Sequence, residues 1–131
     1  MSVIRVLLVD DNAAFLSAAA RFLNSLAGVE VVARAASAAE GLARAAELRP
    51  DLVLVDVVMP GMSGLELVTL IKKDTDAPKA VIVTLHDSEV YRFAAMTAGA
   101  DSFITKDDLV QELPLLLESL FPGRRTALRR R

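Results

Sequence analysis

The chain has 131 residues, of which 53% are apolar and 24% carry a charge, and its formal net charge is −2. That length and composition fit one compact domain and exclude disordered and disulfide-scaffold proteins. The absence of cysteine excludes disulfides, thiolate metal sites and cysteine nucleophiles. Uncharged stretches reach only nine residues, and the short apolar run before Asp10 is no signal peptide, so we expect a cytoplasmic protein that does not enter a membrane.

The charge is unevenly distributed along the chain. Residues 1–123 hold 10 basic and 17 acidic side chains, a net charge of −7, whereas residues 124–131 hold five arginines and no acid. An acidic surface repels the phosphate backbone of nucleic acid. We therefore expect one folded domain over residues 1–121 that does not itself bind nucleic acid, followed by a basic tail or linker over residues 122–131.

Five short β-branched runs alternate with longer amphipathic stretches. The predicted strands span Val3–Val9, Val29–Ala33, Leu52–Val55, Ala80–Thr84 and Ser102–Thr105. Several of these runs are continuously apolar, which is typical of parallel strands covered on both faces. Glu30 in the second run favours an edge position for that strand.

A helix is predicted after each strand. In the first helix apolar residues recur at helical spacing over residues 15–26, and Gly28 ends the run. Ser37 and Glu40 form a capping-box pattern at the start of the second helix. Pro114 should bend the fifth helix or delay its start, because it has no N–H to donate. The last three predicted helices span Leu65–Lys72, Val90–Thr97 and Leu109–Leu120.

Five β–α units in succession indicate an α/β fold with a doubly wound, five-stranded parallel sheet and right-handed crossovers. Ligands of such sheets bind beyond the carboxyl ends of the strands. Polar residues that directly follow a strand are therefore the first candidates for a functional site.

Charged and hydroxyl side chains stand at four of these strand ends. Asp10 and Asp11 follow the first strand, Asp56 follows the third, Thr84 ends the fourth and Lys106 follows the fifth. Three crowded carboxylates repel one another, and a hard cation such as Mg²⁺ would relieve that repulsion. Two cations and a hydroxyl around one carboxylate make an anion site suited to phosphoryl transfer. Lys106 and Thr84 would each bind a phosphoryl oxygen.

On this interpretation Asp56 is the nucleophile, which attacks phosphorus to give an aspartyl phosphate. Asp10 and Asp11 would hold the metal directly or through water, and the backbone carbonyl of Val58 is a further candidate ligand. Each feature alone has an ordinary structural explanation: two aspartates before a helix often serve as its N-cap, and a lone lysine is usually solvated. The set is specific because its members occur together, in order, on the expected strands.

These motifs resemble the receiver domains of two-component response regulators, the family of the chemotaxis regulator. The resemblance covers residues 3–120 and rests on Val-Asp-Asp at 9–11, Asp-Val-Val-Met-Pro-Gly-Met-Ser-Gly at 56–64, Val-Thr at 83–84, Ala-Gly-Ala-Asp at 98–101 and Thr-Lys at 105–106. It implies a flavodoxin-like (βα)5 fold with strand order 2-1-3-4-5. It also implies that Asp56 accepts a phosphoryl group from a sensor histidine kinase or phosphotransfer protein, with Mg²⁺ required.

The resemblance further implies a switch made by Thr84 and Phe103. When the Thr84 hydroxyl bonds the phosphoryl group, it vacates space that Phe103 fills, which changes the surface of the fourth helix, fifth strand and fifth helix. A partner would bind that surface, or a second copy of the chain would pair through it or through the first and fifth helices. Phe103 has no hydroxyl, so it would act by packing alone; the alternative is an ordinary core aromatic.

Two positions depart from many receivers. Lys106 is followed by Asp107 instead of proline, so we expect a trans peptide bond there. Leu85 stands where a small residue is common, and it would partly cover the phosphoryl pocket. Together with Val58 and His86 it would tune dephosphorylation, in the direction of slower hydrolysis; a plain surface-loop position is the simpler explanation of His86.

Residues 84–87 and 106–107 are most similar to receivers of the nitrate-regulator type, which usually precede a helix-turn-helix DNA-binding domain. The chain is therefore either a stand-alone receiver or the receiver of a transcriptional regulator. In both cases we expect a signalling switch that promotes only its own phosphorylation and dephosphorylation, and not an enzyme.

Two other families share parts of this pattern. A flavodoxin-like FMN protein needs a Ser/Thr/Gly-rich loop after the first strand, where this chain has Asp10 and Asp11. A haloacid-dehalogenase-like, Mg²⁺-dependent phosphohydrolase also uses an aspartate nucleophile, a threonine and a lysine. That family has Asp-x-Asp, whereas Asp56 is followed by Val57 and Val58, so the general acid is missing.

Overall fold

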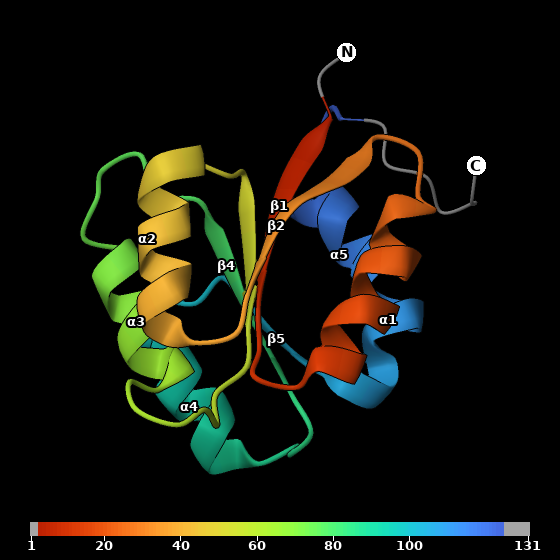
Figure 1. The fold of residues 1–131 in the computed structure, drawn as a ribbon. Coiled ribbons are helices and arrows are strands. Elements are labelled where there is room, and N and C mark those ends of the chain that lie inside the picture. The colour runs from red at the N-terminus through yellow and green to blue at the C-terminus, as the bar shows by residue number, and fades with distance from the viewer. Residues whose placement is uncertain (1–2, 125–131) are drawn as a thin grey trace.

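Within residues 3–124, which the computed structural model describes, five strands form one parallel sheet (Figure 1). The strands are β1 (Ile4–Val9), β2 (Val29–Ala35), β3 (Leu52–Val55), β4 (Lys79–Thr84) and β5 (Ser102–Thr105). Their order across the sheet is β2-β1-β3-β4-β5. The predicted flavodoxin-like fold and the edge position of the strand that contains Glu30 are therefore confirmed.

The helices of the described residues cover both faces of this sheet. They are α1 (Ala13–Asn24), α2 (Ala38–Leu48), α3 (Gly64–Ile71), α4 (Glu89–Ala98) and α5 (Leu109–Leu120), and a 3₁₀ turn η1 (Lys106–Asp108) joins β5 to α5. Helices α1 and α5 lie on one face, and α2, α3 and α4 lie on the other (Figure 1). No helix in the described part of the chain is long and apolar enough to cross a membrane.

Alternation along each strand divides the core into two clusters. On β1, Val6 and Leu8 pack with the helices α1 and α5, whereas Leu7 and Val9 pack with α2 and α3. Because successive side chains of a strand point to opposite faces, a strand buried on both faces must be apolar at every position. This is the physical reason for the uninterrupted apolar runs in the sequence.

The helix caps fix where the connecting loops begin. Ser37 Oγ accepts the Glu40 N–H at 3.1 Å, and Glu40 Oε1 accepts the Ala36 N–H at 2.8 Å, so the predicted cap of α2 is present. Gly99 ends α4 in the left-handed conformation, with φ of 99°. Each cap satisfies backbone groups that the helix end leaves without a partner.

The first helix ends earlier than the spacing of its apolar residues predicted. It stops at Asn24, and Ser25 is its C-cap, whereas Leu26 is buried beyond the helix. Asn24 Oδ1 accepts the backbone N–H of Val31 at 2.9 Å, which ties the end of α1 to β2. The apolar spacing continued past the helix because Leu26 joins the same core cluster from the turn.

Of the two effects predicted for Pro114, a bend or a delayed start of the fifth helix, the delayed start is wrong, and the predicted bounds Leu109–Leu120 are confirmed. Helix α5 begins at Leu109 and runs on through Pro114, which is buried inside it. Proline removes only the hydrogen bond to the carbonyl four residues earlier, that of Val110. Val110 is 52% exposed, so water can reach that end of the helix.

The start of the predicted basic tail is held against the fold. The Arg124 guanidinium lies 3.4 Å from Asp51 Oδ2, donates to the Val3 carbonyl at 3.3 Å and stacks on the Phe121 ring. Asp51 Oδ2 also accepts the Arg5 backbone N–H at 2.9 Å. The rest of the predicted tail, residues 125–131, lies outside the described residues.

Candidate functional site

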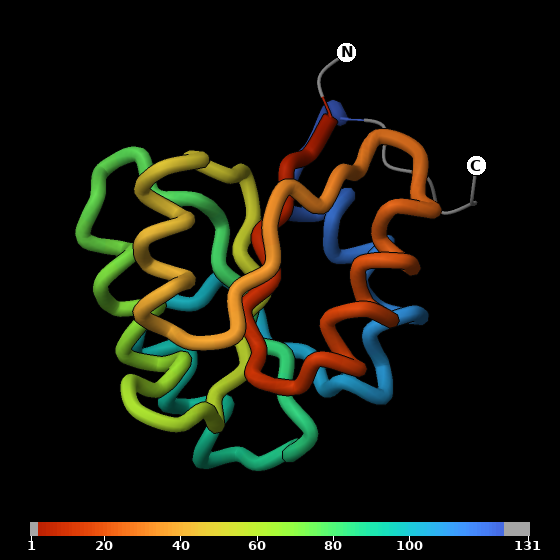
Figure 2. The backbone as a smooth tube through the Cα atoms, in the orientation of Figure 1, coloured from red at the N-terminus to blue at the C-terminus, as the bar shows by residue number. Residues whose placement is uncertain are grey.

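The loops after β1, β3 and β4 and the turn after β5 meet at one end of the sheet (Figure 2). Asp10 directly follows β1, Asp56 follows β3, Thr84 ends β4 and Lys106 follows β5. The register keeps these positions level, because Val9 pairs with Val55 and Thr84 pairs with Thr105. The polar groups predicted at the strand ends are therefore brought together.

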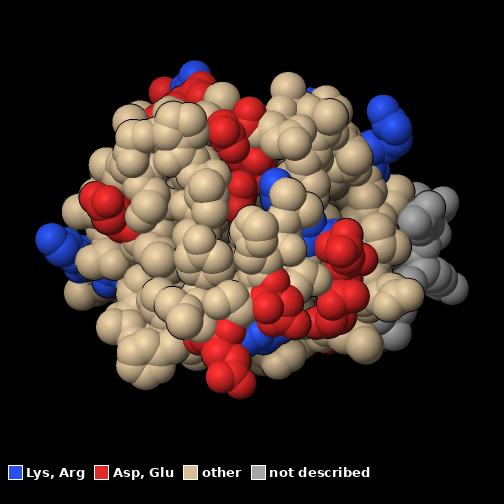
Figure 3. All heavy atoms as spheres, turned by 90° about the horizontal axis from the view of Figure 1, so that it is seen from below, with Lys and Arg blue, Asp and Glu red and all other residues tan. Residues whose placement is uncertain are grey.

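All of these groups except Asp10 line an open cleft. The residues around it are Asp11, Asn12, Asp56, Val58, Thr84, Leu85, His86 and Lys106. Viewed from this end, acidic side chains gather on the face with basic side chains between them (Figure 3). The cleft thus combines a surplus of carboxylates with a lysine and a hydroxyl.

Three aspartates cluster at the cleft, Asp11 and Asp56 in its lining and Asp10 beside them. One carboxylate oxygen from each of Asp10, Asp11 and Asp56 lies within 4.8 Å of the other two. Asp10 is 2% exposed and Asp56 is 7% exposed, whereas Asp11 is exposed. Two of the three negative charges are therefore largely removed from water, where repulsion between carboxylates is strong.

The aspartate pair is not the N-cap of α1. Asn12 fills that role, because its side chain accepts the Phe15 N–H at 3.0 Å. Asp10 Oδ1 accepts the Asn12 N–H at 2.8 Å, which fixes the turn out of β1. Since Asn12 satisfies the helix end, the carboxylates of Asp10 and Asp11 are available for another purpose.

Lys106 is buried among these acids and is not solvated. Its side chain is 8% exposed, and its Nζ lies 2.7 Å from Asp10 Oδ2 and 3.6 Å from Asp56 Oδ2. The ammonium also lies 4.3 Å from the centroid of the Phe15 ring. One positive charge therefore faces two buried negative ones, and an aromatic face helps to hold it in place.

The environment of Asp56 raises the pKa of its carboxyl above the ordinary value of 3.8. Burial contributes most, because it penalises the charged form, and the negative charge of Asp10 adds to it. The Lys106 ammonium and hydrogen bonds from the Thr84 side chain and the Val58 backbone act in the opposite direction. Positive charge brought near Asp56 would favour the ionised form.

The residues fit a divalent cation. Asp10 Oδ2 is buried and has no hydrogen-bond partner, although it forms an ion pair with the Lys106 ammonium at 2.7 Å. Carboxylate oxygens are ligands that Mg²⁺ prefers. A cation beside Asp10, Asp11 and Asp56 would use that oxygen and offset the excess negative charge. This chain therefore has an oxygen site that could hold a metal.

The side chains predicted to tune dephosphorylation stand at the mouth of the cleft. Val58 is 54% exposed and Leu85 is 62% exposed, and both contribute to its lining. His86 is exposed as well, with its ring centroid 6.3 Å from that of Tyr91. Leu85 thus stands at the rim of the cleft, and its side chain is largely in solvent.

Gly64 supports the site in a way that the sequence pattern did not reveal. A Cβ at this position would lie 1.8 Å from the backbone oxygen of Asp56, and the Gly64 N–H donates to the Val57 carbonyl at 3.1 Å. Only glycine lets the start of α3 approach the Asp56 backbone so closely. The glycine in the turn before the third helix was the available signal, but its contact depends on the folded chain.

Thr84 and Phe103 lie on the same face of neighbouring strands. Phe103 pairs with Ile82, two residues before Thr84, and all three side chains are buried. Phe103 belongs to the core cluster on the α2–α3–α4 side of the sheet. The two side chains predicted to form the switch therefore lie on one face of the sheet.

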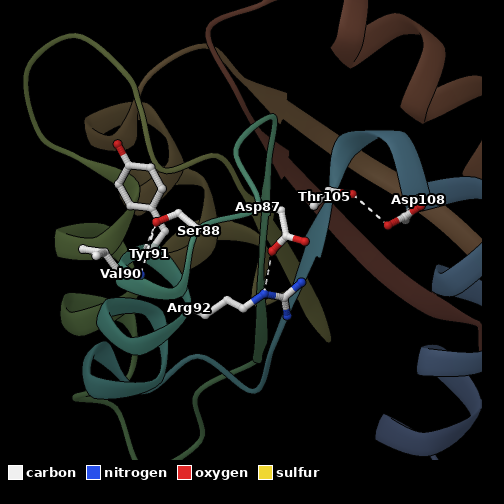
Figure 4. Close-up of polar contacts among 7 residues, drawn as sticks. All are labelled: Asp87, Ser88, Val90, Tyr91, Arg92, Thr105 and Asp108. Atoms are coloured by element: carbon white, nitrogen blue, oxygen red, sulfur yellow. Dashed lines mark hydrogen bonds and ion pairs between the residues drawn. The ribbon is translucent and has the colours of Figure 1, made fainter.

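The turn that carries Lys106 is closed without proline. The backbone from residue 3 to residue 124 has no cis peptide bond, so the Lys106–Asp107 bond is trans, as predicted. The Thr105 hydroxyl donates to Asp108 Oδ2 at 3.0 Å across η1 (Figure 4). This contact holds the turn in which Lys106 points back to Asp10.

Comparison with known proteins identifies the family. Residues 6–118 match the model of the response regulator receiver domain. The chain belongs to this family. It is 40% identical over 112 residues to the response regulator protein VraR of Staphylococcus aureus, an alignment that covers 84% of the chain and 53% of that protein. The chain thus spans about half the length of the curated relatives that it matches.

Solved structures agree with this assignment. The receiver superposes with a TM-score of 0.86 and 33% identity on a two-component response regulator of the LuxR family from Aurantimonas sp. SI85-9A1, covering 95% of this chain and 89% of that one. The response regulator domain of Thermotoga maritima CheB gives a TM-score of 0.79 and 32% identity, covering 90% and 93%. The receiver is accordingly a module of two-component signalling.

Proposed function

We propose that this receiver accepts a phosphoryl group on Asp56 and signals through the resulting change of shape. The observation that carries the proposal is the position of the Asp56 carboxylate, level with two other aspartates and 3.6 Å from the buried Lys106 ammonium. An aspartate with such neighbours is suited to become an acyl phosphate, because Lys106 and a cation held by the other two aspartates would together neutralise the phosphoryl oxygens.

The donor is a phosphohistidine of a sensor histidine kinase or of a phosphotransfer protein. An Asp56 oxygen attacks phosphorus, the P–O bond forms and the P–N bond breaks, and the histidine nitrogen leaves with the electron pair and takes up a proton. Asp56 must be ionised to attack, so the groups that lower its pKa also prepare it for reaction. Asp56 holds the phosphoryl group as a mixed anhydride.

Mg²⁺ is the cofactor that the donor set favours, and Asp10, Asp11, Asp56 and the Val58 carbonyl are the groups that would hold it. When bound, it neutralises charge on the phosphoryl oxygens. Lys106 neutralises a second oxygen from the other side. The Thr84 hydroxyl, which already donates to the Asp56 carboxylate, would turn its hydrogen bond to the phosphoryl group.

The signal leaves through the α4–β5–α5 face. Movement of Thr84 toward the phosphoryl group and the packing of Phe103 behind it would reshape this face. Its reader is another protein or a second copy of the chain, which could also pair through α1 and α5. We propose that the receiver acts in the cytoplasm, performs no catalysis beyond its own phosphorylation and dephosphorylation, and does not bind nucleic acid through residues 1–121.

Two arrangements were predicted for this chain: a stand-alone receiver, or the receiver of a transcriptional regulator. The curated relatives extend well beyond the matched segment, since the alignment covers 53% of VraR. We propose the second arrangement, with residues 122–131 as the basic linker.

A haloacid-dehalogenase-like phosphohydrolase is not favoured. Such an enzyme would need an acid two residues after the nucleophile, and Val58 stands there with an exposed side chain. The family match also runs through the whole sheet as a receiver.

The proposal is tested by incubating the protein with acetyl phosphate and Mg²⁺ and measuring intact mass. We expect one phosphoryl group per chain, none on Asp56→Asn, and none when EDTA removes the metal. Asp76→Asn changes an exposed acid of the loop between α3 and β4 and is the matched control, which should be phosphorylated normally. Labelling that persists in Asp56→Asn would contradict the assignment of the acceptor.

A further inference from the structure

Arg92 of α4 contacts the switch aromatic and the loop beside the cleft at the same time. Its guanidinium carbon lies 4.6 Å from the centroid of the Phe103 ring. Its Nε donates to Asp87 Oδ1 at 2.8 Å, a contact that Figure 4 shows between the start of α4 and the loop before it. A single side chain therefore bridges β5 and the β4–α4 loop.

The contact with Phe103 favours the buried position of the ring. Phe103 is 7% exposed, whereas the Arg92 side chain is 47% exposed and the Asp87 side chain is 63% exposed. A guanidinium is attracted to the face of an aromatic ring, and this attraction is lost if the ring turns out to solvent. Arg92 is thus arranged to stabilise one of the two positions of Phe103.

The contact with Asp87 extends this influence toward the cleft. Asp87 stands three residues after Thr84, in the loop that also provides Leu85 and His86 to the cleft lining. The ion pair fixes Arg92 above the ring and links it to the loop that must follow any movement of Thr84. In this structure Phe103 is buried, which is the position expected of the ring in the phosphorylated receiver.

We propose that Arg92 is a positioning residue of the switch, which holds Phe103 in its buried position and so favours binding of the phosphoryl group at Asp56. The inference rests on the proposed function of Asp56. Two conformations that differ in their contact with Arg92 must also differ in their affinity for a phosphoryl group. Removing the contact therefore weakens phosphoryl binding although Arg92 is not among the residues that line the cleft.

The first test measures the affinity of the protein for beryllium fluoride with Mg²⁺, a tetrahedral mimic of a phosphoryl group on a carboxylate. Tyr91 is the only tyrosine and the chain has no tryptophan, so its fluorescence reports on the start of α4. Arg92→Gln should weaken binding by about two- to five-fold, which is the range expected for losing a cation–π contact and an exposed ion pair. Arg92→Lys, which keeps the charge without the planar stack, should fall in between.

Arg44 provides a matched control. It also lies on a helix, is 45% exposed and forms a 2.8 Å ion pair with Glu47, but α2 is remote from the switch. Arg44→Gln should leave the affinity unchanged. In a Phe103→Leu background, Arg92→Gln should lose most of its effect, because the ring through which it acts is gone. A simple loss of stability would not depend on Phe103 in this way.

A second measurement follows the ring itself. With 4-fluorophenylalanine at position 103, Arg92→Gln should shift the ¹⁹F resonance toward that of a solvent-exposed ring, even without the mimic. An unchanged resonance and unchanged affinity would overturn the role of Arg92, while Asp56 is still phosphorylated normally. If the wild-type protein fails to bind the mimic or to take up phosphate, the proposed function fails instead, and the ¹⁹F measurement still decides whether Arg92 positions the ring.

Discussion

At each end of the sheet a lysine lies 2.7 Å from an aspartate: Lys106 beside Asp10 at the carboxyl end, and Lys72 beside Asp101 at the amino end. At the amino end the negative charge of Asp101 is balanced by the positive charge of Lys72. Asp101 Oδ2 also accepts the Ala80 N–H, and Lys72 Nζ also donates to the Pro78 carbonyl, both at 2.8 Å. The acid and the base form an ion pair, and each also makes a hydrogen bond to the nearby backbone. This pair therefore has a structural role, because it connects α3, β4 and β5.

At the carboxyl end the charges do not balance. Three carboxylates surround a single ammonium, and the buried Asp10 Oδ2 lacks a hydrogen bond. The Lys106 and Asp10 side chains are 8% and 2% exposed, against 22% and 24% for the Lys72 and Asp101 side chains. A close Lys–Asp contact therefore does not reveal whether a region serves stability or function. A surplus of buried negative charge indicates a functional region, because such a surplus does not favour folding.

Replacing the two lysines should have the largest effect and should separate the two ends. Lys106→Met leaves Asp10 and Asp56 buried without a counter-charge and should cost about 3–5 kcal/mol of unfolding free energy. Lys72→Met breaks a half-solvated ion pair and should cost about 1 kcal/mol. Urea denaturation measures both, and added Mg²⁺ should restore part of the stability of Lys106→Met only. If both variants lost the same unfolding free energy and Mg²⁺ restored none of it, both Lys–Asp pairs would have the same, purely structural role.

Gly64→Ala tests the close backbone packing behind Asp56. The new Cβ would meet the Asp56 carbonyl, which cannot move without displacing the phosphoacceptor, so we expect a loss of about 1–3 kcal/mol and slower phosphorylation by acetyl phosphate. Gly41→Ala is the matched control in α2. Its nearest contacts are the side-chain methyls of Val9, which can shift, and it should leave the phosphorylation rate intact.

The raised pKa of Asp56 makes the stability of the folded protein depend on pH. The folded protein keeps the Asp56 proton at higher pH than the unfolded chain does, so stability from this group is present at low pH. That stability is lost as pH rises from about 3.8 through the folded-state pKa. In EDTA, Asp56→Asn should therefore be more stable than the wild type near neutral pH, with the difference shrinking as pH falls. Denaturation curves across this pH range show whether Asp56→Asn is more or less stable than the wild type. Asp101→Asn should be less stable than the wild type.

Leu85→Ala should have the smallest effect. If Leu85 restricts the access of water to the phosphorylated cleft, its truncation should speed dephosphorylation by up to about tenfold, equivalent to about 1.4 kcal/mol in the barrier. Loss of ³²P label from the phosphorylated protein measures the rate. With 62% of the side chain exposed, an unchanged rate would mean that Leu85 stands too far toward solvent to matter.

Most of the site at the carboxyl ends of the strands could be predicted from the sequence, because parallel strands place the residues that follow them at one edge of the sheet. Asp10, Asp56, Thr84 and Lys106 needed only the strand boundaries and this rule. The burial of Lys106 on the Phe15 ring could not be predicted, since it depends on how α1 packs. The end of α1 was mispredicted because tertiary contacts outweighed local signals, whereas the bounds of α5 were predicted correctly although Pro114 lies inside it. The contacts of Arg124 with Val3 and Asp51 join distant segments, and those of Gly64 and Arg92 depend on how neighbouring elements fold back on one another, so none of them leaves a local pattern.

The central claim is that the carboxyl end carries its negative charge for a cation and a phosphoryl group. Thermal unfolding during a Mg²⁺ titration tests it most directly. At a free Mg²⁺ concentration about 100 times the dissociation constant, a site present only in the folded state adds about 2.7 kcal/mol. We predict a clear rise in Tm for the wild type, a smaller rise for Asp56→Asn, and an undiminished rise for Asp101→Asn. A wild-type Tm that does not respond to Mg²⁺, or an equal rise in Asp56→Asn, would contradict it.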